Sequence, residues 1–142
     1  MKEIEITREM FEKKEEVFAN LLSVLGIEGE LDGIVHQAKV DKSGSNYLKV
    51  DFKGEVVLAD GDREKVIIEF QKGKANMDHA KALVYPLIDE NCKRAIWIAE
   101  SYGEYVKKAV QKFNEKLGGD GYTFYLVTYR RVEGNMDFTK VV

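Results

Sequence analysis

The 142-residue sequence contains one cysteine, one proline and two histidines, and it has no long uninterrupted run of apolar residues. With Cys92 alone, the chain can form no internal disulfide and no cysteine-based zinc cluster. Its apolar runs are too short to cross a bilayer, and its first residues lack the apolar core of a secretory signal. We therefore expect no membrane association and a cytoplasmic location.

Hydrophobic residues make up 44% of the chain and charged residues 33%, a balance typical of a compact domain with one core. The net charge of -3 is unevenly distributed. Residues 1–62 carry 8 Lys or Arg against 14 Asp or Glu, whereas residues 63–142 carry 14 against 11. The basic second half permits a local phosphate-binding face, although an ordinary solvated surface gives the same pattern.

The order of helical and strand patterns predicts an α/β (α+β) fold. Apolar residues at helical spacing predict helices over residues 8–25, with Thr7 as N-cap, over 77–89, and from the Ser101–Glu104 capping pattern to Leu117. Period-two patterns predict strands at 47–52, 55–59, 65–71, 95–99 and 122–132. The join at Lys53-Gly54 is either a turn or a bulge within one strand. A short strand near 34–40 is compatible with the glycine-rich stretch 26–45.

This order predicts one domain over residues 1–133, in which helices pack on the faces of a mixed sheet. Residues 134–142 show no helical or strand pattern that we could assign, and we expect them to form a loose tail.

Glu55 and Glu69 stand out because each falls within an apolar strand. Glu69 follows Val66-Ile67-Ile68, and Gln71 emerges two residues later on the same face. A hairpin at Asp60-Gly61-Asp62 would bring Glu55 toward Glu69. Two close carboxylates repel unless a cation lies between them, and oxygen ligands suit Mg2+ or Mn2+. The alternative is a structural role at the strand end, paired with lysines or with a helix N-terminus.

Several segments occur in an order that resembles a known group. They are Val66 to Gln71, Asp78-His79, Leu83-Val84-Tyr85 and Ala95 to Glu100. Together they resemble a group in the PD-(D/E)XK nuclease-like, or restriction-endonuclease-like, superfamily with Glu-x-Gln in place of Glu-x-Lys. The resemblance implies a core of order α-β-β-β-α-β with a mixed sheet, in agreement with the predicted chain order α-β-β-β-α-β-α-β.

The resemblance also implies the residues of a metal site. By spacing, Glu55 stands where the first acid is expected, and Asp51 is the alternative of the usual residue type. Glu69 matches the second acid. Gln71 stands where lysine is commonest, so it would orient a water by hydrogen bonding rather than by charge. With the carbonyl of Phe70, the two acids would hold Mg2+ or Mn2+ for phosphodiester hydrolysis of nucleic acid, DNA being favoured.

Other charged residues are expected near this site. Glu15 is either an outer carboxylate or plain helix surface, and Asp78 and His79 either contact phosphate or serve the structure. The cations that follow the site in the sequence would bind nucleic acid: Lys72, Lys74, Lys81 and Arg94.

The resemblance suggests two functions. The favoured one is a nuclease, working alone or as a homodimer, in repair, recombination or defence. The alternative is a catalytically inactive nuclease-fold module that binds nucleic acid or a protein partner, as the acidic net charge and Gln71 suggest.

Overall fold

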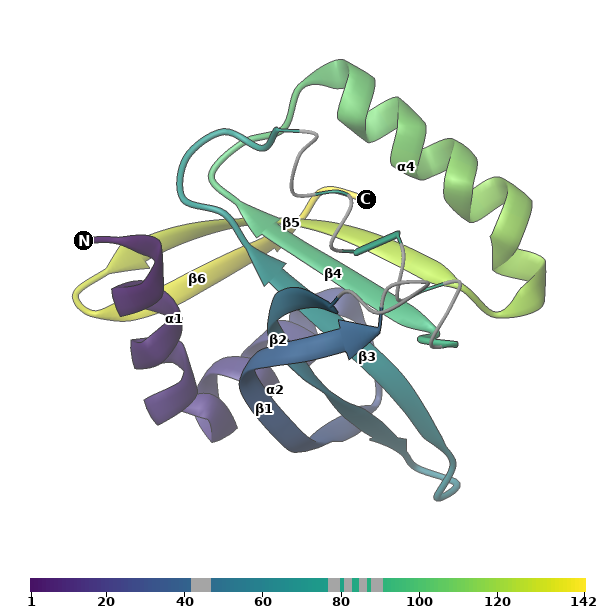
Figure 1. Ribbon diagram of the computed structural model, residues 1–142, viewed down its shortest axis with the longest axis horizontal. Helices are drawn as coiled ribbons and strands as arrows, with labels where there is room; N and C mark the ends of the chain where they lie inside the picture. Colours follow the sequence, from purple (N-terminus) through teal and green to yellow (C-terminus); the bar gives the residue numbers. More distant parts are fainter. Residues whose placement is uncertain (42–46, 77–79, 81–82, 85–86, 88–90) are drawn as a thin grey trace.

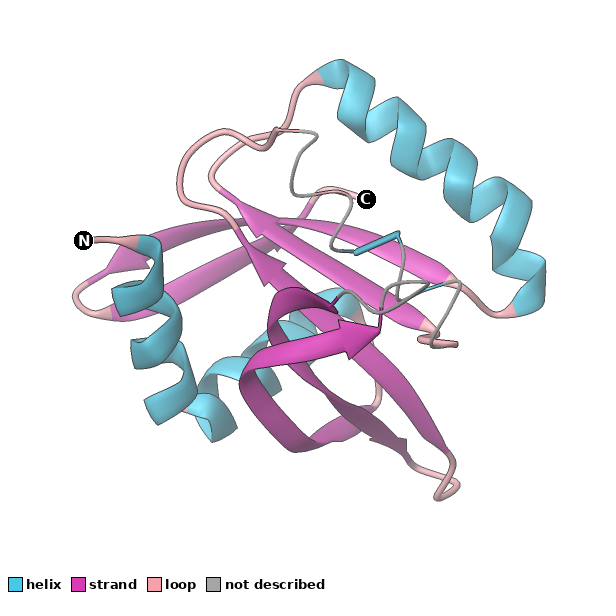
Figure 2. Cartoon of the chain, viewed as in Figure 1, coloured by secondary structure: helices cyan, strands magenta, loops and turns pink. Residues whose placement is uncertain are grey.

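A computed structural model of the protein describes residues 1–41, 47–76, 80, 83–84, 87 and 91–142 (Figure 1). Its centre is a mixed sheet of six strands, which Figure 2 shows in magenta. The strands lie in chain order: β1 (Gly29–Asp41), β2 (Tyr47–Leu58), β3 (Arg63–Phe70), β4 (Arg94–Ala99), β5 (Thr123–Val132) and β6 (Asn135–Lys140). β3, β4 and β5 run parallel, and the other neighbours are antiparallel. The predicted mixed sheet with flanking helices is therefore confirmed.

Helices cover both faces of this sheet. α1 (Glu3–Glu12) and α2 (Lys14–Leu25) pack on one face, and α4 (Glu104–Leu117) packs on the other (Figure 1). Successive side chains of β3 point to opposite faces of the sheet. Ile68 and Phe70 therefore pack in the core with α1 and α2, whereas Ile67 packs in the core with α4. A short 3-10 helix (Gly118–Asp120) leads from α4 into β5. No helix among the described residues is long and apolar enough to cross a membrane.

The N-terminal prediction was wrong in its boundaries. Two helices that meet at Lys13 replace the single helix expected over 8–25, and the first begins before Thr7. Thr7 is buried inside α1, where its hydroxyl donates to the Ile4 carbonyl at 3.3 Å, so it cannot be the N-cap. The helix expected over 77–89 falls mostly outside the described residues.

The C-terminal segment differs from the loose tail that we expected. After a turn at Gly134 (φ 81°), residues 135–140 form β6 and pair with β5. Phe138 is buried in the core beneath α2, which supplies the apolar contact that stabilises this edge strand. The domain therefore extends at least to Lys140.

β2 is one continuous strand, and the Lys53-Gly54 join lies within it. A Cβ atom at Gly54 would lie 2.6 Å from the Ile34 Cδ1 atom and 3.0 Å from the Asp32 carbonyl oxygen. Glycine is therefore required for β1 to approach β2, and β1 shifts register between Asp32 and Val35 at the same level.

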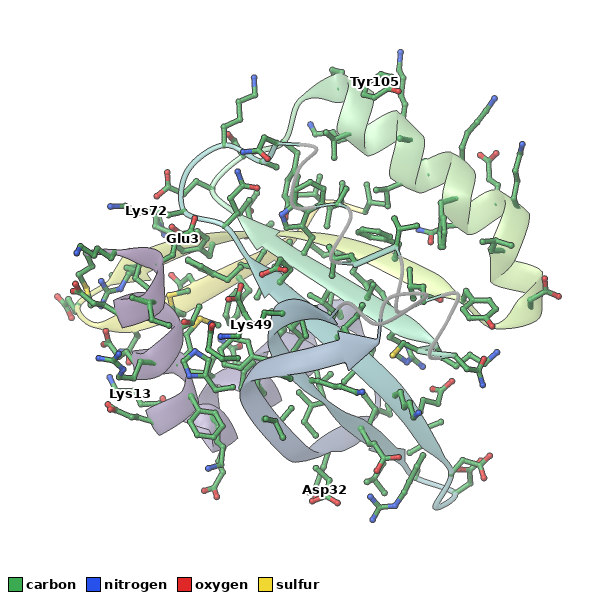
Figure 3. All side chains as sticks on the ribbon, viewed as in Figure 1. Glu3, Lys13, Asp32, Lys49, Lys72 and Tyr105 are labelled. Carbon is green, nitrogen blue, oxygen red and sulfur yellow. The ribbon has the colours of Figure 1, made fainter. Side chains whose placement is uncertain are left out.

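The buried hydroxyl of Tyr102 ties β4 to β5. It lies within hydrogen-bond distance of the Trp97 and Val127 carbonyls and accepts from the Val127 N–H at 3.3 Å. Tyr102→Phe leaves these groups without this partner, and we expect a loss of about 1–3 kcal/mol in the free energy of unfolding, measured by urea denaturation. Tyr105→Phe is the control, because the Tyr105 side chain projects from α4 with 75% of its surface exposed (Figure 3). Equal stability of the two variants would contradict this role.

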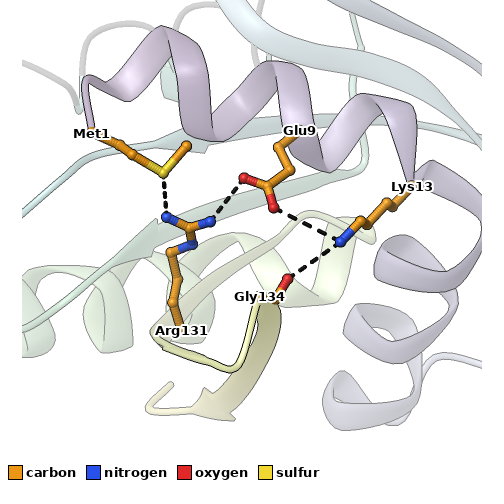
Figure 4. A network of polar contacts seen from close by, with 5 residues as sticks. All are labelled: Met1, Glu9, Lys13, Arg131 and Gly134. Atoms are coloured by element: carbon orange, nitrogen blue, oxygen red, sulfur yellow. Dashed lines mark hydrogen bonds and ion pairs between the residues drawn. The ribbon is translucent and has the colours of Figure 1, made fainter.

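An ion-pair network holds α1 against the β5–β6 hairpin (Figure 4). Arg131 at the end of β5 donates to Glu9 Oε2 at 2.8 Å. Lys13 lies 3.8 Å from Glu9 Oε1 and donates to the Gly134 carbonyl at 3.4 Å. This network fixes α1 along its length and so fixes the position of Glu3 in its first turn.

Candidate functional site

Asp51 lies where β2 and β3 separate. The last backbone pair between these strands is Phe52 with Ile68. Beyond it, the Asp51 side chain bonds to the backbone of β3. Its Oδ2 atom accepts from the Phe70 N–H at 2.7 Å, and its Oδ1 atom accepts from Gln37 Nε2 at 3.3 Å. The carboxylate of Asp51 is therefore anchored at both oxygens, one by the neighbouring strand on each side.

Glu69 meets Asp51 at this point. It lies on β3 opposite Trp97 of β4, and only 7% of its surface is exposed. Burial raises the pKa of the Glu69 carboxyl to about 10, assisted by a hydrogen bond and the negative charge of Asp51 and by the charge of Glu3, while a bond from the Asp51 backbone N–H opposes the shift. In the absence of a cation, a carboxyl with this pKa keeps its proton at neutral pH, and the Glu69 side chain is hydrogen-bonded to that of Asp51.

Glu3 is a third carboxylate near the pair. Its Oε1 atom accepts from the Lys72 backbone N–H at 2.7 Å, and Lys72 Nζ donates to the Met1 carbonyl at 2.7 Å. Figure 3 shows Glu3 and Lys72 side by side at the start of α1. Sequence reasoning missed Glu3, because the predicted helix began at residue 8 and left Glu3 outside every predicted element.

Gln71 is buried, with 4% of its surface exposed, and its amide is bonded at both ends. Its Nε2 atom donates to the Lys74 carbonyl at 2.8 Å, and its Oε1 atom accepts from the Asn76 N–H at 3.1 Å. The structure thus uses Gln71 to hold residues 74–76 against the end of β3. The amide keeps a second N–H and a second lone pair with which it could orient a water, as the sequence suggested.

The structure does not bring Glu55 to the pair. Glu55 lies opposite Lys65, four residues along β3 from Glu69, which is about 13 Å at the rise of a strand. Its carboxylate lies 3.5 Å from Arg63 instead. The expectation that Glu55 approaches Glu69 was wrong, because hairpin register, which the sequence pattern left open, decides which acid faces Glu69.

Glu15 is also outside the site. It is exposed on α2 and lines a hollow of about 490 Å³ with residues 29–34 of β1, away from the carboxyl pair.

The predicted cations divide between the site and other places. Lys72 and Lys74 are exposed and directly follow β3, the strand that carries Glu69. Arg94 lies at the opposite end of β4, opposite Val66, which is about 10 Å from the level of Glu69. It is bonded there to Glu64 at 3.0 Å and to the Tyr125 hydroxyl at 2.6 Å, so its expected place at the site was wrong. Asp78, His79 and Lys81 lie outside the described residues.

The donor set suits a hard divalent cation. Asp51, which is partly exposed, and the buried Glu69 offer carboxylate oxygens from adjacent strands, and oxygen is the ligand that Mg2+ and Mn2+ prefer. Within the described part of the chain, no three His, Cys, Asp or Glu side chains lie close enough together to share an ion. The two carboxylates would therefore need backbone, water or substrate oxygens to complete the ion's coordination shell.

No family model matches this sequence, and no curated protein matches it. Among solved structures, the chain is similar to SfsA from Pyrococcus furiosus in complex with Ca2+, with a TM-score of 0.47 and 14% identity. It is also similar to a repair endonuclease from Pyrococcus abyssi, with a TM-score of 0.44 and 22% identity. The matches cover 95% and 85% of this chain but only 64% and 47% of those two chains, respectively. The functional assignment therefore rests on the residues of the site.

Proposed function

We propose that this domain hydrolyses phosphodiester bonds of nucleic acid, DNA being favoured, with Mg2+ or Mn2+ held by Asp51 and Glu69. The observation that carries the proposal is the side-chain hydrogen bond between the buried Glu69 and Asp51, whose carboxylate the Phe70 N–H also holds. A carboxyl pair in this position must either keep a proton or bind a cation, because two negative charges at close range, one of them buried, repel strongly. The resemblance to the PD-(D/E)XK superfamily supports Glu69 as the second acid and admits Asp51 as the alternative to Glu55 for the first.

Each residue of the site has a definable task. When bound, the ion would polarise the scissile phosphate and lower the pKa of an attacking water. Asp51 and Glu69 would supply ligand oxygens, with the Phe70 carbonyl as a third. The Phe70 N–H fixes the orientation of the Asp51 carboxylate. Gln71 holds residues 74–76 in place beside the site. Glu69 must release its proton for the ion to bind.

Lys72 and Lys74 support a polyanionic substrate. Both are exposed in the segment that directly follows β3, and the Lys74 side chain approaches Gly103, at the start of α4. Lysines in this position attract phosphates without reading sequence. The domain therefore suits contact with a nucleic-acid backbone at the mouth of the site.

A nuclease assay tests the proposal. Single-stranded, duplex, flap and junction substrates, both DNA and RNA, should be incubated with the protein and either Mg2+, Mn2+ or EDTA. We expect cleavage of at least one substrate with a divalent ion and none with EDTA. An absence of cleavage across the whole panel with both ions would contradict the proposed activity.

Salt dependence tests the binding of nucleic acid separately. The double substitution Lys72→Ala with Lys74→Ala should weaken binding and reduce the slope of log K against log salt by about 2, because each lysine neutralises about one phosphate. Fluorescence anisotropy with a labelled duplex between about 50 and 200 mM salt measures it. Lys108→Ala with Lys112→Ala on the exposed side of α4 is the matched control. A slope that matches the wild type in the first variant would remove these lysines from the interface.

A second function is favoured by one observation. Both polar atoms of the Gln71 amide are hydrogen-bonded within the chain, and this neutral residue stands where the resembled superfamily most often has a lysine. A domain that binds nucleic acid or a protein partner without cutting is compatible with that arrangement. Salt-sensitive binding without cleavage in either ion would identify this function.

A further inference from the structure

Gln37 adopts a backbone conformation that strands disfavour. Its φ is 57°, in the left-handed region, although it lies in the middle of β1. Asn91 and Glu133 are the other non-glycine residues with positive φ in the described ranges, and both lie outside the strands. Such a conformation costs free energy for a residue with a Cβ atom, and it persists only where the surroundings enforce it.

The neighbours of Gln37 enforce this conformation. The ring of His36 stacks between Phe11 and Phe52, with centroid distances of 5.6 and 5.2 Å, and its Nε2 atom lies 2.9 Å from the Thr7 hydroxyl. On the other side, Ala38 is buried opposite Val50. Because the His36 ring is held between two aromatic rings and Ala38 is buried in a core, a shift of the strand that would relax the strain at Gln37 would break these contacts.

The side chain of Gln37 forms a hydrogen bond with the candidate site. Gln37 Nε2 donates to Asp51 Oδ1 at 3.3 Å, while the Phe70 N–H occupies Asp51 Oδ2. Two donors on two different strands therefore fix the plane of the Asp51 carboxylate. With that plane fixed, the remaining lone pairs of Asp51 are held in one orientation toward Glu69.

We propose that Gln37 is a positioning residue that orients Asp51 as a ligand for the divalent cation, an inference that rests on the metal site of the proposed function. Residues that orient a metal ligand from the second layer affect metal affinity by about 10- to 100-fold. The backbone strain at Gln37 is then what it costs to place its amide against Asp51. Removing the side chain should therefore weaken metal binding without lowering the stability of the fold.

Gln37→Gly makes this separation measurable. Glycine adopts a φ of 57° without strain and has no amide to donate. We expect the metal-free variant to melt at or above the wild-type temperature, while its affinity for Mn2+, measured by calorimetry at pH 8, falls about 10- to 100-fold. Gln37→Asn is the second variant, because asparagine tolerates positive φ but is too short by one methylene to reach Asp51 in the same way. Gln37→Asn should also lose affinity for Mn2+. If the glycine variant is unstable, Gln37→Asn alone tests whether the Gln37 amide supports metal binding.

Glu133→Gly is the matched control. Glu133 has a φ of 52° in the exposed β5–β6 turn, so glycine relieves the same kind of strain there without touching the site. It should leave Mn2+ affinity unchanged. If the wild type binds Mn2+ and both Gln37 variants bind it equally well, the positioning role is overturned and the metal site stands. If the wild type binds no Mn2+, the metal site itself fails, and the role of Gln37 fails with it.

Discussion

Replacing Asp51 or Glu69 by its amide is expected to abolish metal-dependent cleavage. Either change removes one of two carboxylate ligands and leaves an amide of almost the same shape, so the fold should persist. A divalent ion contributes several kcal/mol to the stabilisation of a phosphodiester transition state, and each 1.36 kcal/mol is about a factor of ten in rate. The loss should therefore be about 10²- to 10³-fold or more, measured as the single-turnover rate on the best substrate.

Glu55→Gln is the control for this experiment. Glu55 lies on the same strand as Asp51 and carries a carboxylate like that of Glu69, but it contacts Arg63 rather than the pair. Cleavage by Glu55→Gln should match the wild type within about a factor of two, since surface ion pairs of this kind contribute little. A severe loss of cleavage rate in Glu55→Gln, with a normal rate in Asp51→Asn, would show that Glu55 rather than Asp51 is the first metal-binding acid.

Glu69→Gln should make the metal-free protein more stable at pH 8. The pKa of Glu69 is raised in the folded chain, so the folded state binds more protons than the unfolded state between the ordinary value of 4.5 and about 10. Stability in the metal-free wild type must then fall as pH rises through that window. A glutamine can donate to Asp51 as the protonated acid does, without this penalty, and we expect a gain of about 1–4 kcal/mol in the free energy of unfolding at pH 8.

Thermal melts at two pH values and with added Mg2+ complete this prediction. The advantage of Glu69→Gln should shrink toward pH 5, where the carboxyl is protonated more readily in both states. Mg2+ should raise the melting temperature of the wild type and leave that of the variant unchanged. A variant that is less stable than the wild type at pH 8 would show that Glu69 is a structural ion-pair partner.

The fold was largely predictable because strand alternation and apolar density are local. The continuous apolar centre of β3 and the short apolar β4 indicated buried strands, and both lie in the middle of the sheet. β6 was missed because its stability comes from pairing with β5 and from one buried side chain, Phe138, rather than from its own composition. The break between α1 and α2 at Lys13 has no proline or glycine to mark it.

The sequence predicted which types of residue form the candidate site, but not which of them lie together. Glu69 was identified because a carboxylate in an apolar strand requires a partner. The identity of that partner depends on where β2 and β3 separate, and a shift of four residues decides between Asp51 and Glu55. Glu3 and Gln37 come from α1 and β1, and only tertiary packing brings these elements to Asp51 and Glu69.

Calorimetric titration of the wild-type protein with Mg2+ at pH 8, in two buffers of different ionisation enthalpy, tests the central claim most directly. The account predicts that Mg2+ binds and releases about one proton for each ion, because Glu69 is protonated before the ion arrives. The observed heat should then depend on the buffer, and Asp51→Asn and Glu69→Gln should each abolish it. An absence of binding, or a heat that is the same in both buffers and in both variants, would contradict a divalent cation site at Asp51 and Glu69.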